Sequence, residues 1–430
     1  MKITFVGHGY VGLVTASIFA DFGNTVYVIG RNPEKIKALT QGEIPIYEPG
    51  LEEIVRRNIN AGRLIFTMDY APAIPESEIV FTAVGTPPTA TGDADLENVL
   101  KVAREIGSNL SGYTVVATKS TVPVGTNKKV REIIESVKDD KAEFDIASCP
   151  EFLREGSAIS DTMFPDRIVI GTESERARKV LLELHKPIAG ERILTNLESA
   201  ELIKYASNSF LANKISFANA IAKLSELSGA DALEVLEGIG FDKRIGNMFL
   251  KPGPGYGGSC FPKDVKALIA IARDYGYDFT LLKSVEEINK QAWKGIVEKC
   301  EKLLGGSVKD KKIGVLGLAF KPDTDDMREA PSIPVITELQ KKGAVIHAYD
   351  PAAMNNSKKI FENVNFEENG YEIAKGANLL LVLTDWNEFK EIDLKKIKEL
   401  MADANIVDAR NIYEPQKAKD LGFVYIGVGR

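Results

Sequence analysis

The sequence predicts two Rossmann-like doubly wound α/β domains joined by a long central helix and a helical middle region. Two openings of the form strand and glycine turn predict the start of one such domain each: KITFVGHGYVG from residue 2 and KKIGVLGLAFKPDTDD from residue 311. Between them, residues 197–228 form one uninterrupted helical pattern that is apolar on more than one face. A chain of 430 residues is long enough for two or three hydrophobic cores.

Strands and helices alternate along most of the chain, which predicts parallel sheets. Residues 2–6 predict a buried strand, YVGLVTASIFADFG a helix that ends in glycine, and NTVYVIG a second strand; EIVFTAV, YTVVATKS, FDIASCP and RIVIG follow as further strands. Later strands are predicted at AVIHAYDP, NLLLVLTD and NIVDAR. We therefore expect a cofactor-binding domain at 1–196, a helical middle at 197–304 that carries the catalytic cysteine, and a second Rossmann-like domain at 305–430.

The composition excludes several classes of protein. Acidic and basic residues are interspersed and the net charge is −7, so nothing suggests a nucleic-acid partner. Apolar runs such as NLLLVLT are too short to cross a bilayer. Cys149, Cys260 and Cys300 are odd in number and widely spaced, which argues against a disulfide framework, and no Cys/His cluster has metal-ligand spacing. We expect a cytoplasmic protein without a metal and without a membrane or nucleic-acid partner.

A G-x-G-x-x-G motif, formed by Gly7, Gly9 and Gly12, follows the first strand and opens the first helix. In that context the glycines permit a tight turn, close approach to a pyrophosphate and close packing of helix on strand. The amides at the start of the helix, at Tyr10 and Val11, then receive the phosphate charge. The motif predicts a dinucleotide site; a merely structural turn is the alternative.

The end of the second strand departs from the usual dinucleotide-binding pattern. An acidic residue normally stands there and binds the ribose 2′-hydroxyl, whereas this chain has Gly30 followed by Arg31. Loss of the carboxylate and gain of a guanidinium is the change expected where a 2′-phosphate is tolerated. In the other interpretation, Asn32 or backbone groups bind the ribose and Arg31 is solvated. NAD and NADP both stay open at this point.

Cys260 stands in GPGYGGSCFPKD, between a glycine-rich loop and a predicted helix. Pro262 suits the first turn of that helix, and a helix N-terminus and a nearby lysine both favour thiolate over thiol. A thiolate beside a dinucleotide fold is useful when the product is an acid: it adds to an aldehyde, and the thiohemiacetal loses a hydride to give a thioester that water hydrolyses. The motif predicts a four-electron oxidation; a buried, inert cysteine in a tight turn is the alternative.

Seven long segments occur in order along the chain: GHGYVG, IPIYEPGLEE, KSTVPVGT, CPEFLREGSAISD, ELIKYASNSF, RIGNMFLKPGPGYGGSCFPKD and GLAFKPDTDDMREAPS. With them the whole chain resembles the nucleotide-sugar dehydrogenases, the UDP-glucose/GDP-mannose dehydrogenase family. The resemblance implies oxidation of C6 of UDP-glucose to UDP-glucuronate with two NAD⁺ reduced per sugar, and a homodimer through the central helix. GDP-mannose or a UDP-N-acetylhexosamine is the alternative substrate, and a cofactor-binding redox sensor is the alternative outside the enzymes.

The resemblance assigns catalytic roles to six residues: Cys260, Lys204, Asn208, Asp264, Thr121 and Glu151. Cys260 is the nucleophile. Lys204 and Asn208, four apart on one helix face, stabilise the alkoxide and the thiohemiacetal oxygen. Asp264 holds Lys204 or a water, while Thr121 and Glu151 position and activate the water that hydrolyses the thioester. The structural alternatives are a solvated Lys204, an Asn208 that bridges helices and an ordinary acidic face at Glu151.

Further residues are assigned to binding by the same resemblance. For the cofactor they are Gly7, Gly9, Tyr10, Val11, Gly12, Gly30, Arg31, Lys35, Gly85, Thr86, Ser120, Thr121, Glu155, Lys263 and Arg328. For the UDP-sugar they are Glu151, Phe152, Leu153, Lys204, Asn208, Arg244, Lys251, Tyr256, Gly257, Cys260, Phe320, Lys321 and Arg410. Arg244 and Lys251 supply positive charge suited to a pyrophosphate, and in the family the arginine reaches across from the partner subunit.

Overall fold

The computed structural model describes residues 1–430. The chain forms two compact units, Met1–Ser207 with Lys266–Gly276 and Asn208–Val265 with Tyr277–Arg430. Two of the three divisions fall inside helices, α8 (Leu197–Ser228) and α10 (Phe261–Asp274), so each unit contains part of both; the third, after Gly276, falls between α10 and α11. The domain boundaries expected after residues 196 and 304 follow changes in sequence pattern instead and stay predictions.

The first unit contains an eight-stranded sheet in the order β3-β2-β1-β4-β5-β6-β7-β8. Its strands are β1 (Lys2–Val6), β2 (Thr25–Ile29), β3 (Leu64–Thr67), β4 (Ile79–Thr82), β5 (Tyr113–Thr118), β6 (Glu143–Ser148), β7 (Arg167–Gly171) and β8 (Glu191–Thr195). All neighbours are parallel except β6 and β7, which pair antiparallel through Ser148 and Gly171. The strand order reverses between β1 and β4, the position at which doubly wound sheets bind ligands.

Helices cover both faces of this sheet: α1 (Tyr10–Asp21), α2 (Pro33–Thr40), α3 (Leu51–Asn60), α4 (Glu97–Asn109), α5 (Thr126–Val137), α6 (Ala158–Met163) and α7 (Glu175–Leu184). Successive residues of a strand point to opposite faces of the sheet, so the strands contribute side chains to two hydrophobic cores, one on each face. On one face the rings of Phe5 and Phe81 stack at 4.8 Å. Phe19 meets the edge of His185, and burial lowers the pKa of this histidine to about 4, so it packs as a neutral ring.

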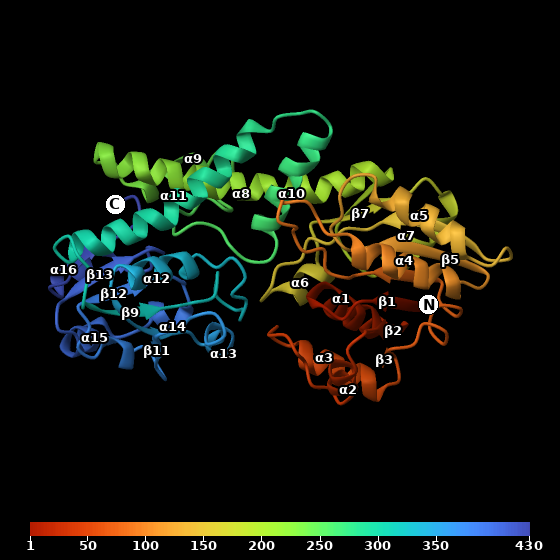
Figure 1. Ribbon diagram of the computed structural model, residues 1–430, viewed down its shortest axis with the longest axis horizontal. Helices are drawn as coiled ribbons and strands as arrows, with labels where there is room; N and C mark the ends of the chain where they lie inside the picture. The colour runs from red at the N-terminus through yellow and green to blue at the C-terminus, as the bar shows by residue number, and fades with distance from the viewer. The chain divides into compact units, whose positions relative to one another are not determined.

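The second unit contains a six-stranded parallel sheet in the order β11-β10-β9-β12-β13-β14. Its strands are β9 (Lys312–Leu316), β10 (Val345–Tyr349), β11 (Val364–Phe366), β12 (Leu379–Val382), β13 (Asn405–Asp408) and β14 (Val424–Ile426). Its helices are α9 (Ala232–Gly240), α11 (Thr280–Leu303), α12 (Ser332–Lys341), α13 (Met354–Ser357), α14 (Asn387–Lys390), α15 (Leu394–Leu400), α16 (Pro415–Asp420) and the 3₁₀ turn η1 (Glu372–Ala374). Figure 1 shows β9, β12 and β13 next to one another, with α12 on one side of them and α14 and α15 on the other.

The predicted fold class is confirmed, because both sheets are Rossmann-like, the first parallel except between β6 and β7 and the second parallel throughout, and the middle of the chain is helical. The predicted central helix is α8, with the predicted bounds. Its apolar residues are not all covered within the chain: Phe210, Phe217 and Leu224 are 63%, 47% and 59% exposed. None of the helices combines the length and the apolar composition that crossing a membrane requires.

Candidate active site

The glycine turn after β1 has the geometry that a dinucleotide needs. Gly7 has a φ of 118°, and a Cβ there would overlap the carbonyl oxygen of Ala83, so a side chain does not fit. A Cβ at Gly12 would overlap the carbonyl oxygen of Gly7, so α1 packs directly on the turn. At Gly9, the N-cap of α1, a Cβ would meet nothing within 4 Å. The first amides of α1 have no partner within the helix and face this open space, where a pyrophosphate can bind. The residues of the turn therefore fit a dinucleotide cofactor.

A buried carboxylate fixes this turn from a distance in the sequence. Glu48 is 7% exposed; it accepts hydrogen bonds from the Tyr10 hydroxyl, from Gly156 N at 2.7 Å and from Ala158 N at 2.8 Å. It therefore ties the start of α1 to the start of α6, next to the half-buried Glu155. Sequence analysis missed Glu48, because a separation of 108 residues between hydrogen-bonded groups leaves no local pattern.

Predicted cofactor residues also gather at the carboxyl ends of β4 and β5. Thr86 Oγ1 donates to the carbonyl oxygen of Thr121 at 2.8 Å, and Ser120 Oγ donates to the carbonyl oxygen of Val84 at 2.7 Å. Gly85 is exposed, and a Cβ on it would meet nothing within 4 Å. Because β4 borders β1 where the strand order reverses, these turns and the glycine turn share one edge of the sheet.

Lys204 on α8 and Glu151 after β6 form a buried ion pair in the first unit. Lys204 Nζ lies 3.0 Å from Glu151 Oε1, and the two side chains are 4% and 8% exposed. The second carboxylate oxygen of Glu151 accepts from Leu153 N at 2.8 Å. The ring of Phe152 lies below both cations: its centroid is 5.3 Å from Lys204 Nζ and 3.8 Å from Arg167 Cζ. Lys204 is therefore not a solvated helix residue.

A second buried lysine, Lys119, lies next to this segment and was missed by sequence analysis. Its side chain donates from Nζ to the carbonyl oxygen of Cys149 at 3.3 Å and stands 5.7 Å from the ring centroid of Phe81. Burial lowers the pKa of Lys119, an effect that the nearby Glu151 opposes and the charge of Lys204 increases. A lysine before a turn is normally solvent-exposed. Here the buried Lys119 instead binds the backbone at Cys149, two residues before Glu151.

Glu201 links α8 to the turn that follows Thr121. Its carboxylate accepts from Gly125 N at 2.7 Å, from Asn127 N at 2.9 Å and from Asn127 Nδ2 at 2.7 Å. The residue is 2% exposed, and burial raises the pKa of Glu201. It therefore caps the N-terminus of α5 from another helix, where α5 has no side-chain cap of its own.

In the second unit, Cys260 directly precedes α10, whose first turn contains Pro262 as the sequence predicts. Cys260 is half-buried, whereas Cys149 and Cys300 are buried. Burial raises the pKa of both buried thiols, that of Cys149 to about 12, so neither is a nucleophile at neutral pH. The hydroxyl oxygen of Ser259 lies 3.5 Å from Cys260 Sγ.

Asn208 and Asp264 are paired in the same unit. Asn208 Nδ2 donates to Asp264 Oδ2 at 2.6 Å, and both residues are buried. The other oxygen of Asp264 pairs with Lys263 Nζ, and Asp264 N donates to the carbonyl oxygen of Cys260 at 2.9 Å. The amide of Asn208 is therefore held in one orientation, and its carbonyl oxygen points away from the carboxylate.

The glycine loop before Cys260 packs on the turn after β9. A Cβ at Gly257 would overlap the carbonyl oxygen of Glu329, and one at Gly258 would lie 2.8 Å from the ring of Phe320. Arg410, which follows β13, donates from Nη2 to the carbonyl oxygen of Phe320 at 2.8 Å. The structure thus brings three predicted substrate residues, Gly257, Phe320 and Arg410, together at the carboxyl edge of the second sheet.

Other predicted residues have local partners. Tyr256 is buried, and its hydroxyl donates to Glu286 Oε1 at 2.7 Å, so this hydroxyl packs the glycine loop on α11. Lys321 Nζ lies 5.7 Å from the ring centroid of Phe320. Arg328 pairs with Asp326 at 2.7 Å.

The two cations expected to bind the pyrophosphate lie on the surface of the second unit. The Arg244 side chain is 89% exposed, with Nη2 2.6 Å from Asp242 Oδ2 in its own turn. Lys251 is also exposed. Neither is held in place by burial, so their roles stay predictions.

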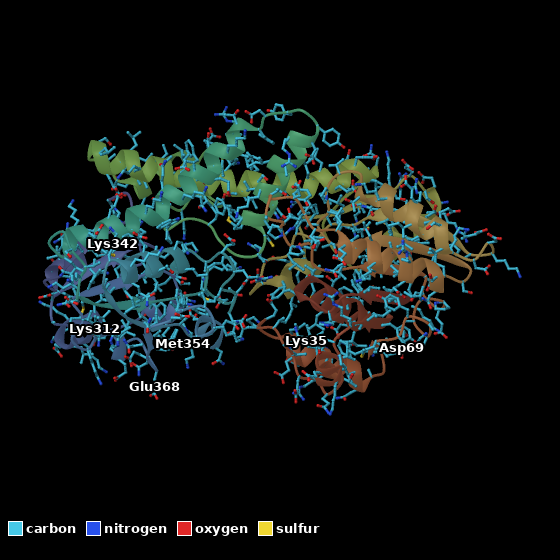
Figure 2. All side chains as sticks on the ribbon, in the orientation of Figure 1. Lys35, Asp69, Lys312, Lys342, Met354 and Glu368 are labelled. Atoms are coloured by element: carbon cyan, nitrogen blue, oxygen red, sulfur yellow. The ribbon has the colours of Figure 1, made fainter.

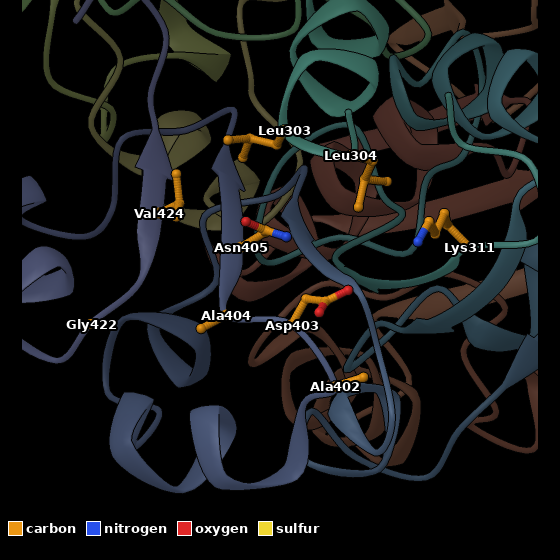
Figure 3. A pocket seen from close by; sticks show the side chains of 9 residues that line it. All are labelled: Leu303, Leu304, Lys311, Ala402, Asp403, Ala404, Asn405, Gly422 and Val424. Atoms are coloured by element: carbon orange, nitrogen blue, oxygen red, sulfur yellow. The ribbon is translucent and has the colours of Figure 1, made fainter. Parts of the chain in front are cut away.

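A cavity of about 480 Å³ in the second unit does not contain these residues. Figure 3 shows its lining, which includes Lys311 before β9, Asn405 at the start of β13 and Val424 at the start of β14. These are the amino ends of the strands, whereas Arg410 follows the carboxyl end of β13. Parallel α/β sheets bind ligands at their carboxyl ends, so this cavity is not the substrate site.

Comparison with known proteins covers the whole chain. Three family models of the UDP-glucose/GDP-mannose dehydrogenase family match: the NAD binding domain over residues 1–189, the central domain over 198–291 and the UDP binding domain over 314–415. The UDP-glucose 6-dehydrogenase TuaD of Bacillus subtilis (strain 168) is 48% identical over 430 residues, which are 100% of this chain and 93% of the relative.

Solved structures agree with these matches. The UDP-glucose dehydrogenase of Pyrobaculum islandicum superposes with a TM-score of 0.93 at 37% identity, covering 100% of this chain and 97% of the other. The UDP-D-ManNAc dehydrogenase of Pyrococcus horikoshii superposes with a TM-score of 0.89 at 28% identity, covering 100% and 99%. The chain therefore belongs to the UDP-glucose/GDP-mannose dehydrogenase family of NAD-dependent oxidoreductases.

Proposed function

We propose that this protein is a UDP-glucose 6-dehydrogenase that converts the C6 hydroxymethyl group of UDP-glucose to the carboxylate of UDP-glucuronate. The observation that carries the proposal is the half-buried thiol of Cys260 at the start of α10, next to the buried Asn208–Asp264 pair. An alcohol dehydrogenase that stops at the aldehyde has no use for a nucleophilic sulfur, whereas an enzyme that makes an acid does.

The carbon–sulfur chemistry proceeds in three steps. Oxidation of the alcohol removes a hydride from C6 and a proton from its oxygen, and the Cys260 thiolate then bonds to the aldehyde carbon. The resulting thiohemiacetal loses a second hydride from C6 and a proton from its oxygen, and becomes a thioester. Water adds to the thioester carbon, the carbon–sulfur bond breaks, and Cys260 leaves as thiolate. When bound, NAD⁺ accepts one hydride in each oxidation, so two molecules are reduced per sugar.

Buried polar groups stabilise the charges that develop on the C6 oxygen. Lys204 supplies an ammonium group and Asn208 an amide N–H one helical turn away, and preorganised donors of this kind stabilise an oxyanion strongly in a water-poor environment. Asp264 fixes the amide of Asn208 and offers a carboxylate to a catalytic water. Glu151, with Thr121, activates the water that hydrolyses the thioester. No histidine belongs to this set, so carboxylates, lysine and water transfer the protons.

The residues grouped around the glycine loop before Cys260 bind the nucleotide part of the substrate. Gly257 allows close approach of backbone, Phe320 offers a ring, and Arg410 offers a guanidinium whose position is fixed by the backbone of Phe320. Burial lowers the pKa of Arg410, which nevertheless stays cationic at physiological pH. Arg244 and Lys251 add positive charge for the pyrophosphate.

A panel of nucleotide sugars tests the proposal. UDP-glucose, GDP-mannose and UDP-N-acetylmannosamine are each incubated with NAD⁺, and reduced cofactor is counted per sugar consumed. We expect two reduced cofactors per UDP-glucose and the highest kcat/KM for that sugar. A higher kcat/KM for either other sugar overturns the substrate assignment. Oxidation of Cys260 by peroxide without turnover of any sugar would favour the redox sensor.

We also propose that the protein is a homodimer through α8. Phe210, Phe217 and Leu224 recur every seven residues, close to two helical turns, and form one exposed apolar stripe; Leu227, 76% exposed, extends it. Two other apolar residues of α8 are partly covered within the chain: Ile215 is half-buried, and Ile221 packs against the core of the second unit. A second copy of the chain is the occupant that matches a self-complementary stripe.

Phe217→Glu is expected to dissociate this dimer, because it buries an unpaired carboxylate in the stripe. Light scattering at micromolar concentration should give twice the chain mass of 47.0 kDa for the unsubstituted protein and a reduced mass for the variant. Phe241→Glu, at an exposed phenylalanine outside α8, is the matched control and should stay dimeric. A fully active monomer contradicts the proposal and with it the cross-subunit role of Arg244.

A further inference from the structure

The position after β2 cannot supply the carboxylate that holds the 2′-hydroxyl of NAD in most dinucleotide folds. Gly30 stands there, and an added Cβ would overlap Cδ2 of His8 and lie 2.7 Å from Cδ1 of Ile36. His8 comes from the glycine turn itself, so its imidazole fills the space in front of Gly30. An aspartate at this position would have to displace that ring.

Two cations flank this space instead. Arg31 follows Gly30 directly, and Lys35 lies in the first turn of α2; both are exposed, and neither has a carboxylate within ion-pair distance. The pKa of the nearby His8 is lowered, mainly by burial and further by the positive charges of Lys35 and Arg31. The positive charges of Arg31 and Lys35 are thus concentrated at the end of β2, where an NAD-selective site places a negative one.

The two cations are also held in place by the local structure. Arg31 Nη1 donates to Asn98 Oδ1 of α4 at 2.9 Å, which leaves the other face of the guanidinium fork for a ligand. Asn32 caps α2 by accepting from Lys35 N at 2.9 Å, which fixes the turn that carries Lys35. Lys35 lies on the surface of α2, where Figure 2 labels it.

We propose that Arg31 and Lys35 form a subsite for the adenosine 2′-phosphate, so that the enzyme binds NADP⁺ as well as NAD⁺. The subsite rests on the proposed function in one respect, since it needs a dinucleotide at the glycine turn after β1. A dianionic phosphate suits it chemically, because the guanidinium offers paired N–H donors and the ammonium adds a point charge.

Binding measured without sugar and without turnover tests the subsite. Isothermal titration of the full chain with NAD⁺ and with NADP⁺ should give dissociation constants within roughly 10-fold of each other. Arg31→Ala and Lys35→Ala should each weaken NADP⁺ binding roughly 10- to 100-fold, the range for a lost charged hydrogen bond, and weaken NAD⁺ binding by a smaller factor, because NAD⁺ has no 2′-phosphate. Raising the salt concentration should weaken NADP⁺ more than NAD⁺.

Lys37→Ala is the matched control, because it removes the same charge from the same helix two residues on, at a different face. It should leave both dissociation constants unchanged. NADP⁺ bound more than about 100-fold more weakly than NAD⁺, or an equal loss of both cofactors in Arg31→Ala, overturns the subsite alone. Failure of both cofactors to bind the unsubstituted protein overturns the dinucleotide site and the proposed function with it.

Discussion

Replacing Cys260 with serine is expected to lower kcat for acid formation by roughly three to six orders of magnitude, the cost of removing a catalytic nucleophile. A serine hydroxyl is hardly ionised at neutral pH, so it neither adds to the aldehyde carbon nor leaves from an acyl intermediate as a thiolate does. The first oxidation does not need the sulfur. Cys260→Ser should therefore still convert some UDP-glucose to the aldehyde, with one reduced cofactor per sugar instead of two.

The measurement is reduced cofactor and UDP-glucuronate, counted separately over time. Cys300→Ala is the matched control: its thiol is fully buried on α11, and burial raises its pKa, so turnover should change little. Both variants are compared by thermal melting, because Cys260 is half-buried and its replacement should not unfold the chain. Full production of UDP-glucuronate by Cys260→Ser would remove the covalent mechanism.

Glu151→Gln is expected to slow thioester hydrolysis roughly 10²- to 10⁴-fold, the contribution of a general base, while hydride transfer continues. A thioester should then accumulate on Cys260 and appear in the intact mass of the protein after UDP-glucose and NAD⁺ are added. The substitution also leaves the buried ammonium of Lys204 without its counter-charge, which costs about 3–5 kcal/mol of stability. Thr121→Ala, which keeps that ion pair, should show the same adduct without this loss.

Glu198→Gln serves as the control for these variants. It also removes a carboxylate that pairs with a lysine, Lys128, and it lies in the first turn of the same helix as Lys204. Both side chains are at least partly exposed to solvent, so their ion pair contributes little to the stability of the protein. Its turnover and intact mass should match the unsubstituted protein. Slow turnover of Glu151→Gln and Thr121→Ala with no adduct on Cys260 would contradict the hydrolytic role of both residues.

Features that depend on short-range patterns were predictable from the sequence. The glycine turn at Gly7, the helix start after Cys260 and the full extent of α8 all follow from the spacing of glycine, proline and apolar residues within a few turns. The similarity of long segments to one family is the source of the roles proposed for Lys204 and Asn208, which no spacing rule gives.

Features that depend on tertiary partners were not predictable in this way. Glu48, Lys119 and Glu201 are charged residues that ordinarily face solvent, yet each is buried against backbone groups. Their partners lie 30 to 110 positions away, so only the folded chain reveals that they support the turns around the site. The steric block in front of Gly30 is of the same kind, because it depends on where His8 packs.

The carboxylate of Glu201 gives the first turns of α8 a mechanical role. Three hydrogen bonds join it to the amides that open α5, and Lys204 stands three residues further along the same rigid helix. Because breaking three charge-assisted hydrogen bonds at once costs free energy, we expect the turn that opens α5 to move with α8 when the helix shifts. We therefore expect the distance between Lys204, on α8, and the turn that follows Thr121 to change little when α8 shifts.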